Sequence, residues 1–264
     1  MNGSYWETSG RYMNHHTVIK IHLSNRSSFS YFCHMQPINE FAEGKVLLFD
    51  KPLHWTSFDL VRKVRSLIKI PKVGHAGTLD PLATGLLIVC TGKFTKKINE
   101  YMGMEKEYTG TFTLGATTPT YDLESIPENF ISIEHLNEEE IHAATKNFVG
   151  DILQMPPQHS AIKKDGKRLY ESARQGIEVK VDARPVTIKE FSITKIELPI
   201  VYFKVVCSTG TYIRSLANDF GKALNVGAHL SSLCRTRIGE FKVEDAKSIE
   251  QFEAEIKEIR KTEL

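Results

Sequence analysis

The sequence predicts an α+β fold in which helices flank a mixed, largely antiparallel sheet. Three observations support this prediction. Apolar runs of strand length recur along the chain, several follow one another without an intervening helix, and amphipathic segments separate the others. Because hairpins join antiparallel strands whereas parallel strands need a long crossover, a doubly wound sheet fits less well. No internal repeat and no linker rich in proline or glycine divides residues 44–250.

The first half of the chain alternates between the two kinds of element. The apolar run KVLLFDK, 45–51, is typical of a buried strand. Residues 57–69 place apolar side chains on one helical face and basic ones mostly on the other, which predicts an amphipathic helix. Residues 106–115 alternate threonine with larger apolar residues, so a strand with one buried face is expected. Asn137 and Glu140 have the spacing of a capping box and predict a helix start.

The second half continues this mixture. A short helix is expected over 168–176, where a glycine ends the helical spacing. Two successive strands are predicted over 186–198 and 199–208, and a helix over 211–224. A further strand precedes a charged terminal helix over 248–261.

Residues 1–42 differ in composition from the rest of the chain. They are rich in serine, asparagine and histidine and hold one short apolar patch, without the pattern of a signal peptide. We expect a poorly ordered N-terminal extension, or sequence upstream of the true start, with Met35 as the alternative start. Residues 43–264 are expected to form one domain that ends in a short helix.

The composition excludes several classes of protein. The apolar runs are shorter than the roughly 20 residues that a membrane span needs. The four cysteines lie far apart, so neither a zinc site nor a disulfide scaffold is expected, and reduced thiols fit a cytoplasmic protein. Sequence patterns for nucleotide hydrolysis, dinucleotide binding, acyl transfer and zinc proteolysis do not occur. We therefore expect no cofactor and no metal.

Basic residues concentrate between Lys51 and Lys72, although the net charge is only +2. This stretch contains six basic residues and only one acidic residue, Asp59. A local basic face favours a polyanionic partner such as a nucleic acid. A solvated helix face explains the same charges equally well.

The stretch GHAGTLDPLATGLL, 74–87, contains one carboxylate, Asp80. Asp followed by Pro is a frequent helix start, with Asp80 as the cap and Pro81 at the first helical position. A cap needs neither the neighbouring glycines nor His75, and these favour a functional site. Arg214, in GTYIRS, is a candidate partner that would lower the pKa of Asp80 by about 1 to 3 units. An ionised aspartate can act as a nucleophile or base without a cofactor.

This motif resembles the catalytic motif of the TruB-type tRNA pseudouridine synthases. The resemblance extends from about Gly44 to Phe241 through six segments in the family's order: KVLLFDKP, GHAGTLDPLATGLL, KEYTGTFTLGATTPTYD, QMPPQHSAIKKDGKRLYESARQGIEV, STGTYIRSLANDFG and AHLSSLCRTRIGEF. It implies the pseudouridine synthase catalytic fold and a cofactor-free isomerase that converts uridine-55 in the T loop of tRNA to pseudouridine. It also implies base flipping, binding of the T-arm stem-loop, and a monomer with neither a membrane nor an obligate protein partner.

Carried over by position, the resemblance implies the site residues. Asp80 is the catalytic acid, which attacks the ribose, attacks the base or removes a ribose proton. Tyr108 stacks on the target uracil, and Arg214 pairs with the catalytic carboxylate. His75 enters the RNA loop, and Lys51 lies in the Lys-Pro motif behind the site. The remaining substrate-binding candidates are one apolar residue near the pocket and four cations: Leu233, Arg62, Lys63, Lys69 and Lys72.

The chain departs from the family pattern at four places, one of which is the acidic stretch TYDLES, a reduced version of the family's motif. Residues 53–55, Leu-His-Trp, stand where the family usually has a turn with glycine. Cys234 replaces the first arginine of a Leu-Arg-Arg run, so that Arg235 remains and one phosphate contact is lost. The chain ends about 23 residues after Phe241, so we expect no C-terminal PUA domain, or one reduced to a helix.

Two other classes of function stay open. A non-catalytic module that binds or folds tRNA would use the same basic face and aromatic residues. A glycoside-cleaving enzyme would need a second carboxylate, for which Asp122 and Asp219 are the candidates. At the level of residues, Tyr108 lies in phase with Phe112 and Leu114 and would otherwise be read as part of the core.

Overall fold

The structure of the protein, a computed structural model, describes residues 37–160, 163–164, 167–169, 179 and 181–262. The chain divides into two units, Met1–Met35 and Gln36–Leu264, and the described residues all belong to the second. The extension expected over 1–42 lies mostly outside the described residues. Its expected boundary falls inside the first helix, α1, Pro37–Glu43. Most of the helix expected over 168–176 also lies outside them.

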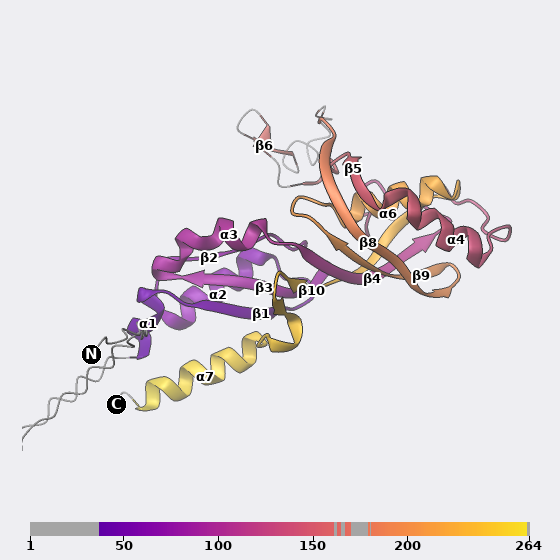
Figure 1. The fold of residues 1–264 in the computed structure, drawn as a ribbon. Helices are drawn as coiled ribbons and strands as arrows, with labels where there is room; N and C mark the ends of the chain where they lie inside the picture. Colours follow the sequence, from indigo (N-terminus) through magenta and orange to yellow (C-terminus); the bar gives the residue numbers. More distant parts are fainter. Residues whose placement is uncertain (1–36, 161–162, 165–166, 170–178, 180, 263–264) are drawn as a thin grey trace, which may run out of the picture. The chain divides into compact units, whose positions relative to one another are not determined.

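A nine-stranded sheet organises the second unit (Figure 1). Its main strands are hydrogen-bonded in this order: β1 Val46–Lys51, β3 Ala83–Thr91, β10 Ala228–Ile238, β4 Lys106–Leu114, β9 Ile200–Cys207, β8 Arg184–Glu197 and β5 Gly150–Gln154. β2, Val73–His75, also pairs with β3, and β11, Phe241–Lys242, pairs with β10. Among the described residues, only the pairing of β3 with β10 in this sheet is parallel. The predicted mixed, largely antiparallel sheet is confirmed.

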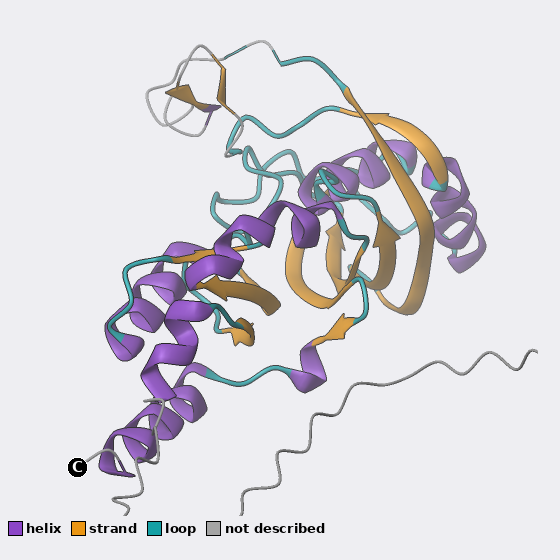
Figure 2. Ribbon diagram, turned by 60° about the vertical axis from the view of Figure 1, so that its left-hand side comes forward, coloured by secondary structure: helices purple, strands orange, loops and turns teal. Residues whose placement is uncertain are grey.

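Helices flank this sheet (Figure 2). The remaining α-helices are α2 Ser57–Ile68, α3 Ile98–Gly103, α4 Glu138–Ala144, α6 Ile213–Ala223 and α7 Ile249–Thr262. The short 3-10 helices are η1 Gly92–Lys97, η2 Thr145–Phe148 and η3 Val243–Asp245, and a separate hairpin joins β6 Lys163–Lys164 to β7 Lys167–Arg168. The helices expected over 57–69, after Asn137, over 211–224 and over 248–261 are confirmed.

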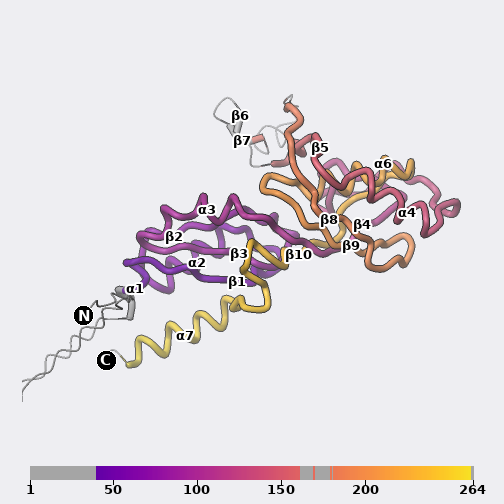
Figure 3. Tube along the Cα trace, viewed as in Figure 1, coloured from indigo at the N-terminus to yellow at the C-terminus, as the bar shows by residue number. Residues whose placement is uncertain are grey.

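β10 comes from the C-terminal part of the chain but lies between β3 and β4 from the first half (Figure 3). It lies beside two apolar cores. In one, α6 packs against β4, β8 and β9, and Phe112 stacks on Phe203 with ring centroids 4.2 Å apart. In the other, α2 and α7 pack against β1 and β3, with Phe252 against Phe49. Gly110 is required where β4 and β10 meet, because a Cβ there would lie 2.2 Å from the carbonyl oxygen of Ser232.

The start of α2 is fixed to the motif that holds Asp80. Thr56 caps the helix in a complete capping box: its hydroxyl accepts from the Asp59 N–H at 3.0 Å, and its own N–H donates to the Asp59 carboxylate at 3.0 Å. The buried Ser57 hydroxyl accepts from the Leu79 N–H at 2.8 Å and donates to the Leu79 carbonyl at 3.1 Å. The residue before Asp80 is therefore anchored to α2.

The helix that Asp80 and Pro81 could begin does not form. β3 begins at Ala83 instead, and almost all of its residues are buried between β1, β2 and β10. Pairing on both edges and burial on both faces outweigh a local cap that is worth roughly 1 kcal/mol. Because no helix starts here, the Asp80 carboxylate is not occupied in capping a helix end.

Candidate active site

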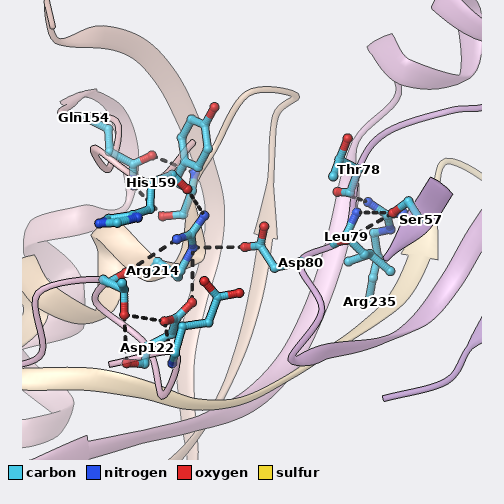
Figure 4. A network of polar contacts seen from close by, with 12 residues as sticks. Ser57, Thr78, Leu79, Asp80, Asp122, Gln154, His159, Arg214 and Arg235 are labelled. Carbon is cyan, nitrogen blue, oxygen red and sulfur yellow. Dashed lines mark hydrogen bonds and ion pairs between the residues drawn. The ribbon is translucent and has the colours of Figure 1, made fainter. Parts of the chain in front are cut away.

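Asp80 and Arg214 form an ion pair at the centre of the site (Figure 4). Arg214 Nε lies 2.9 Å from Asp80 Oδ2. Arg214 is the second residue of α6. Gln154, at the end of β5, holds the start of that helix: it accepts from the Tyr212 N–H at 2.7 Å and donates to the Tyr212 carbonyl at 3.0 Å. Asp80 and Arg214 therefore lie in contact, as expected, although they are far apart in the sequence.

A second carboxylate shares the same arginine. Asp122 Oδ2 lies 3.6 Å from Arg214 Nε, and both side chains are 5% exposed. Arg214 also donates to the carbonyls of His159 at 3.0 Å and Thr120 at 3.5 Å. The Thr120 hydroxyl in turn donates to Asp122 Oδ1 at 2.6 Å. These contacts hold the guanidinium in one orientation, a role that the sequence did not predict for Asp122.

Burial raises the pKa of Asp80 above its ordinary value, and the Asp122 carboxylate adds to the rise; the Arg214 guanidinium and the Lys51 ammonium oppose it. Arg214 lowers this pKa, as expected, but burial outweighs its effect, so the net shift is upward instead of downward. The arginine was considered alone, whereas the folded site also removes the carboxyl from water. The Asp80 side chain is 38% exposed, so it still reaches the pocket beside it.

That pocket has a volume of about 280 Å³, close to the lower limit of roughly 300 Å³ for ordinary small-molecule sites. Its lining includes Leu79, Asp80, Met102, Lys106, Tyr108, Tyr212, Arg214, Leu233 and Arg235. The lining therefore contains one carboxylate and three cations among aromatic and aliphatic side chains. An enclosed space of this kind can hold a planar, polar ring against an ionisable group.

Tyr108 belongs both to the core and to the pocket. It is 8% exposed, packs with the core of α6, and lines the cavity beside Asp80. Burial raises the pKa of its phenol, although the nearby Arg235 guanidinium opposes the rise, so the phenol stays neutral at ordinary pH. The two interpretations drawn from the sequence are thus compatible, because one edge of the core is the wall of the pocket.

Arg235 is a structural residue of the site rather than a free phosphate ligand. It is fully buried, and its Nε donates to the Leu86 carbonyl at 2.8 Å. Its Nη2 and Nη1 donate to the carbonyls of Gly77 at 3.1 Å and Thr78 at 3.4 Å. Its guanidinium therefore holds the backbone before Asp80. Strand periodicity alone gives no sign that this arginine, unlike Arg237, turns fully inward.

Lys51 also lies out of reach of RNA. Its side chain is fully buried, and its Nζ donates to the carbonyls of Pro52 at 2.9 Å and Trp55 at 2.6 Å. Burial lowers its pKa to about 8, against the attraction of Asp80. Its position behind the site agrees with the Lys-Pro motif. The prediction that Lys51 contacts the substrate directly disagrees with the structure, because its ammonium binds the carbonyls of a turn.

The other predicted substrate contacts lie at different depths. His75, at the end of β2, is half-buried, and its Nδ1 has no hydrogen-bond partner among the described residues. Burial lowers the pKa of its imidazole, which favours the neutral ring. Leu233 of β10 is half-buried and lines the pocket with Asp80. His75 is not part of that pocket lining.

The four predicted cations lie on or just after α2, outside the pocket lining. Arg62 is exposed and pairs with Asp59 at 2.7 Å, and Lys63 pairs with Glu253 of α7 at 2.6 Å. Lys69 and Lys72 are exposed, and no described residue forms an ion pair with either. The structure therefore leaves two of the four cations unneutralised.

The described residues contain neither a metal site nor a membrane span. No cluster of three or more histidine, cysteine or acidic side chains is arranged to hold a metal ion. None of the described helices has the length and apolar character to span a membrane.

Family models match almost all of the chain after α2 begins. Residues 65–213 match the TruB family pseudouridylate synthase N-terminal domain, and residues 214–264 match the tRNA pseudouridylate synthase B C-terminal domain. A Flavobacterium johnsoniae protein called tRNA pseudouridine synthase B is 58% identical over 81% of this chain and 96% of its own length. A Phocaeicola vulgatus protein of the same name is 51% identical over 80% and 93%.

Solved structures share the fold. A Cbf5-Nop10-Gar1 complex superposes with a TM-score of 0.68 and 30% identity, over 86% of this chain and 59% of the solved chain. An H/ACA RNP bound to a substrate RNA containing 2′-deoxyuridine gives a TM-score of 0.65 and 27% identity, over 86% and 58%. With the pocket that holds Asp80, Tyr108 and Arg214, these similarities settle the family: the chain belongs to the TruB family of pseudouridylate synthases.

Proposed function

We propose that this protein isomerises uridine-55 in the T loop of tRNA to pseudouridine, without a cofactor. The observation that carries the proposal is the Asp80–Arg214 ion pair beside a pocket walled by Tyr108, in a chain of the TruB family. The names of the Flavobacterium and Phocaeicola relatives support tRNA as the substrate.

The reaction rearranges one nucleoside and changes no atom count. The bond between the ribose C1′ and the base N1 breaks, the uracil turns, and C1′ bonds to C5 of the base. The proton on C5 leaves and N1 gains one. A cavity that retains the severed ring is therefore as necessary as the group that labilises the bond, and the pocket of about 280 Å³ supplies it.

We assign the central roles to three residues. Ionised Asp80 acts on the nucleoside, and Arg214, held by the carbonyls of His159 and Thr120, positions its carboxylate. Tyr108 stacks on the everted uracil. Flipping a base out of a loop costs a few kcal/mol, and stacking on an aromatic ring returns about 1 to 3 kcal/mol.

The RNA outside the pocket is held by a second group of residues in this proposal. His75 enters the loop that the flipped base vacates, and Leu233 packs against the base. Lys69 and Lys72, whose charges are unneutralised, contact backbone phosphates, with Arg62 and Lys63 beside them. We further propose that residues 43–264 act as the catalytic domain, as a monomer in the cytoplasm, with no protein partner required.

The glycoside-cleaving alternative loses support from the geometry. Such an enzyme needs a second carboxyl on the opposite side of the bond. Asp122 is buried and bound to the same arginine as Asp80, and Asp219 is absent from the pocket lining. Neither carboxylate is placed for that role.

The proposal is tested with purified protein and an unmodified T-arm stem-loop that carries tritium on C5 of the target uridine. The wild type should release tritium, and chemical sequencing should map pseudouridine to one position. Asp80→Asn should abolish release while it still binds the RNA. If Asp80→Asn keeps its activity, or if the wild type binds the RNA without forming pseudouridine, the result favours a non-catalytic tRNA-binding module. Free uracil in the supernatant would favour glycoside cleavage.

A further inference from the structure

The turn of residues 52–55 is fastened directly to the loop that carries Asp80. The His54 N–H donates to the Pro81 carbonyl at 2.8 Å. The buried Lys51 ammonium holds two carbonyls of the same turn. His54 has a φ of 66°, a left-handed conformation that glycine adopts at the lowest cost. The chain instead keeps an imidazole there, and that side chain is exposed.

Large apolar and aromatic side chains gather at this turn and at the first turn of α2. Leu53 is 48% exposed, Phe58 is 56% exposed, and Trp55 is half-buried. We call Leu53, His54, Trp55 and Phe58 the entry surface. Exposed apolar side chains that cluster within six consecutive residues, rimmed by polar ones, are typical of a binding surface.

Cations continue this surface along α2. Phe58, Arg62 and Arg65 follow one another at spacings of four and three and so share one side of the helix, and Lys69 follows as its C-cap. The Arg65 guanidinium lies 5.8 Å from the centre of the Phe58 ring. Arg62 lines a surface depression together with His54. Aromatic rings beside cations suit single-stranded nucleic acid, because rings stack on unpaired bases while cations attract phosphates.

We infer that the entry surface binds nucleobases of the substrate RNA next to the flipped uridine, by stacking on Phe58 and His54. This inference rests on the proposed function, which brings an RNA loop with unstacked bases to Asp80. The hydrogen bond from His54 to Pro81 joins the entry surface to the catalytic loop, so an RNA strand entering the pocket passes beside it. The cations on the same helix favour RNA over an apolar protein segment as the occupant.

The test measures the Kd of the unmodified T-arm stem-loop for Phe58→Ser and His54→Gly. Each variant should bind roughly tenfold more weakly than the wild type, within the range for loss of one stacking contact. Phe130→Ser removes an aromatic ring that is 77% exposed and lies outside the entry surface, so its Kd should not change. His54→Gly relieves the left-handed strain, so its melting temperature should equal or exceed that of the wild type. Weak binding by that variant could not then be blamed on unfolding.

A salt titration separates stacking from charge. Because Phe58→Ser removes no cation, its Kd should be raised at every salt concentration, with the slope of log Kd against log salt unchanged. Unaltered Kd values for both variants of an active enzyme would overturn this inference alone. A wild type that binds through the entry surface but forms no pseudouridine would instead overturn the proposed function.

Discussion

Arg214 contacts two carboxylates at once, and this determines the protonation of the residue proposed to do the chemistry. Asp80 accepts its closest contact from Arg214 Nε, while the more deeply buried Asp122 shares that nitrogen. Burial and the second negative charge together raise the pKa of Asp80. Activity that needs the Asp80 carboxylate should therefore be lost, as the pH falls, at a higher pH than an ordinary aspartate predicts.

Replacing Asp122 tests this account. Asp122→Asn removes a negative charge and leaves Arg214 to Asp80 alone, and both effects lower the pKa of Asp80. The acid limb of the kcat profile should shift to lower pH, while kcat at the optimum falls because the guanidinium is held less firmly. Asp219→Asn, a change on α6 outside the pocket lining, is the matched control and should leave the profile in place. An acid limb that moves upward in Asp122→Asn contradicts the account.

Arg235 gives a stability prediction of the same kind. Arg235→Leu removes the donor to the carbonyl of the buried Leu86 and to the carbonyls of Gly77 and Thr78, and an unsatisfied buried polar group costs about 1 to 3 kcal/mol. Urea denaturation should show a loss of roughly 3 kcal/mol in the free energy of unfolding. Arg237→Leu, on the same strand, breaks partly exposed ion pairs with Glu105 and Glu107 and a hydrogen bond to the Gly239 carbonyl; because water can replace these partners, it should cost less, about 1 kcal/mol. Equal losses would mean that the backbone before Asp80 is held by other contacts.

At the scale of elements, the start of α2 connects helix stability to the site. Its capping box joins Thr56 to Asp59, and the next residue, Ser57, holds the backbone of Leu79. One helix and one strand thus hold the backbone beside Asp80 and Arg214: α2 through the Ser57 side chain and β5 through the Gln154 side chain. Substitutions at these helix and strand ends should therefore also alter the positions of Asp80 and Arg214.

Thr56→Ala should lower the free energy of unfolding by about 1 kcal/mol, because the Asp59 N–H loses its acceptor. Thr56→Ser keeps that acceptor and should restore most of the loss. Equilibrium unfolding in urea of the two variants beside the wild type measures both. If the serine variant is as unstable as the alanine variant, the threonine contributes through its methyl group and the cap explanation is wrong.

At the scale of the whole molecule, unneutralised positive charge lies just after the C-terminal end of α2, where we propose that RNA binds. Arg62 and Lys63 are paired with acids, whereas Lys69 and Lys72 have no ion-pair partner among the described residues. A free cation that contacts a phosphate displaces a counterion when RNA binds. Lys69 and Lys72 should therefore contribute most to the salt dependence of RNA binding.

Lys69→Ala and Lys72→Ala should each reduce the slope of log K against log salt by about 0.7 to 0.9 for the T-arm stem-loop. Filter binding over a range of salt concentrations measures the slope. Lys146→Ala removes another exposed lysine, in η2, and should leave the slope as it is. A slope that stays constant in the first two variants would place the RNA on a different surface.

The sequence by itself determined most of the fold and the position of the motif acid. Hydrophobic periodicity placed α2, β4, β8 and β9 within a few residues of their observed ends, because each buries one regular face. The pattern Asn137 to Glu140 fixed a helix start for an equally local reason. The resemblance to the family then directed attention to Asp80 and its partners.

The tertiary structure alone decided what the local pattern could not. In the folded protein the residues after Asp80 form a strand, and Arg235 and Lys51 are buried. The net pKa shift of Asp80 is upward, whereas a downward shift was expected. Each of these outcomes depends on burial in the folded molecule, and the position of Arg235 also depends on backbone carbonyls supplied by distant segments. Spacing along the chain reports which face a side chain occupies, but only the packed molecule determines how much water is removed from it and which groups replace that water.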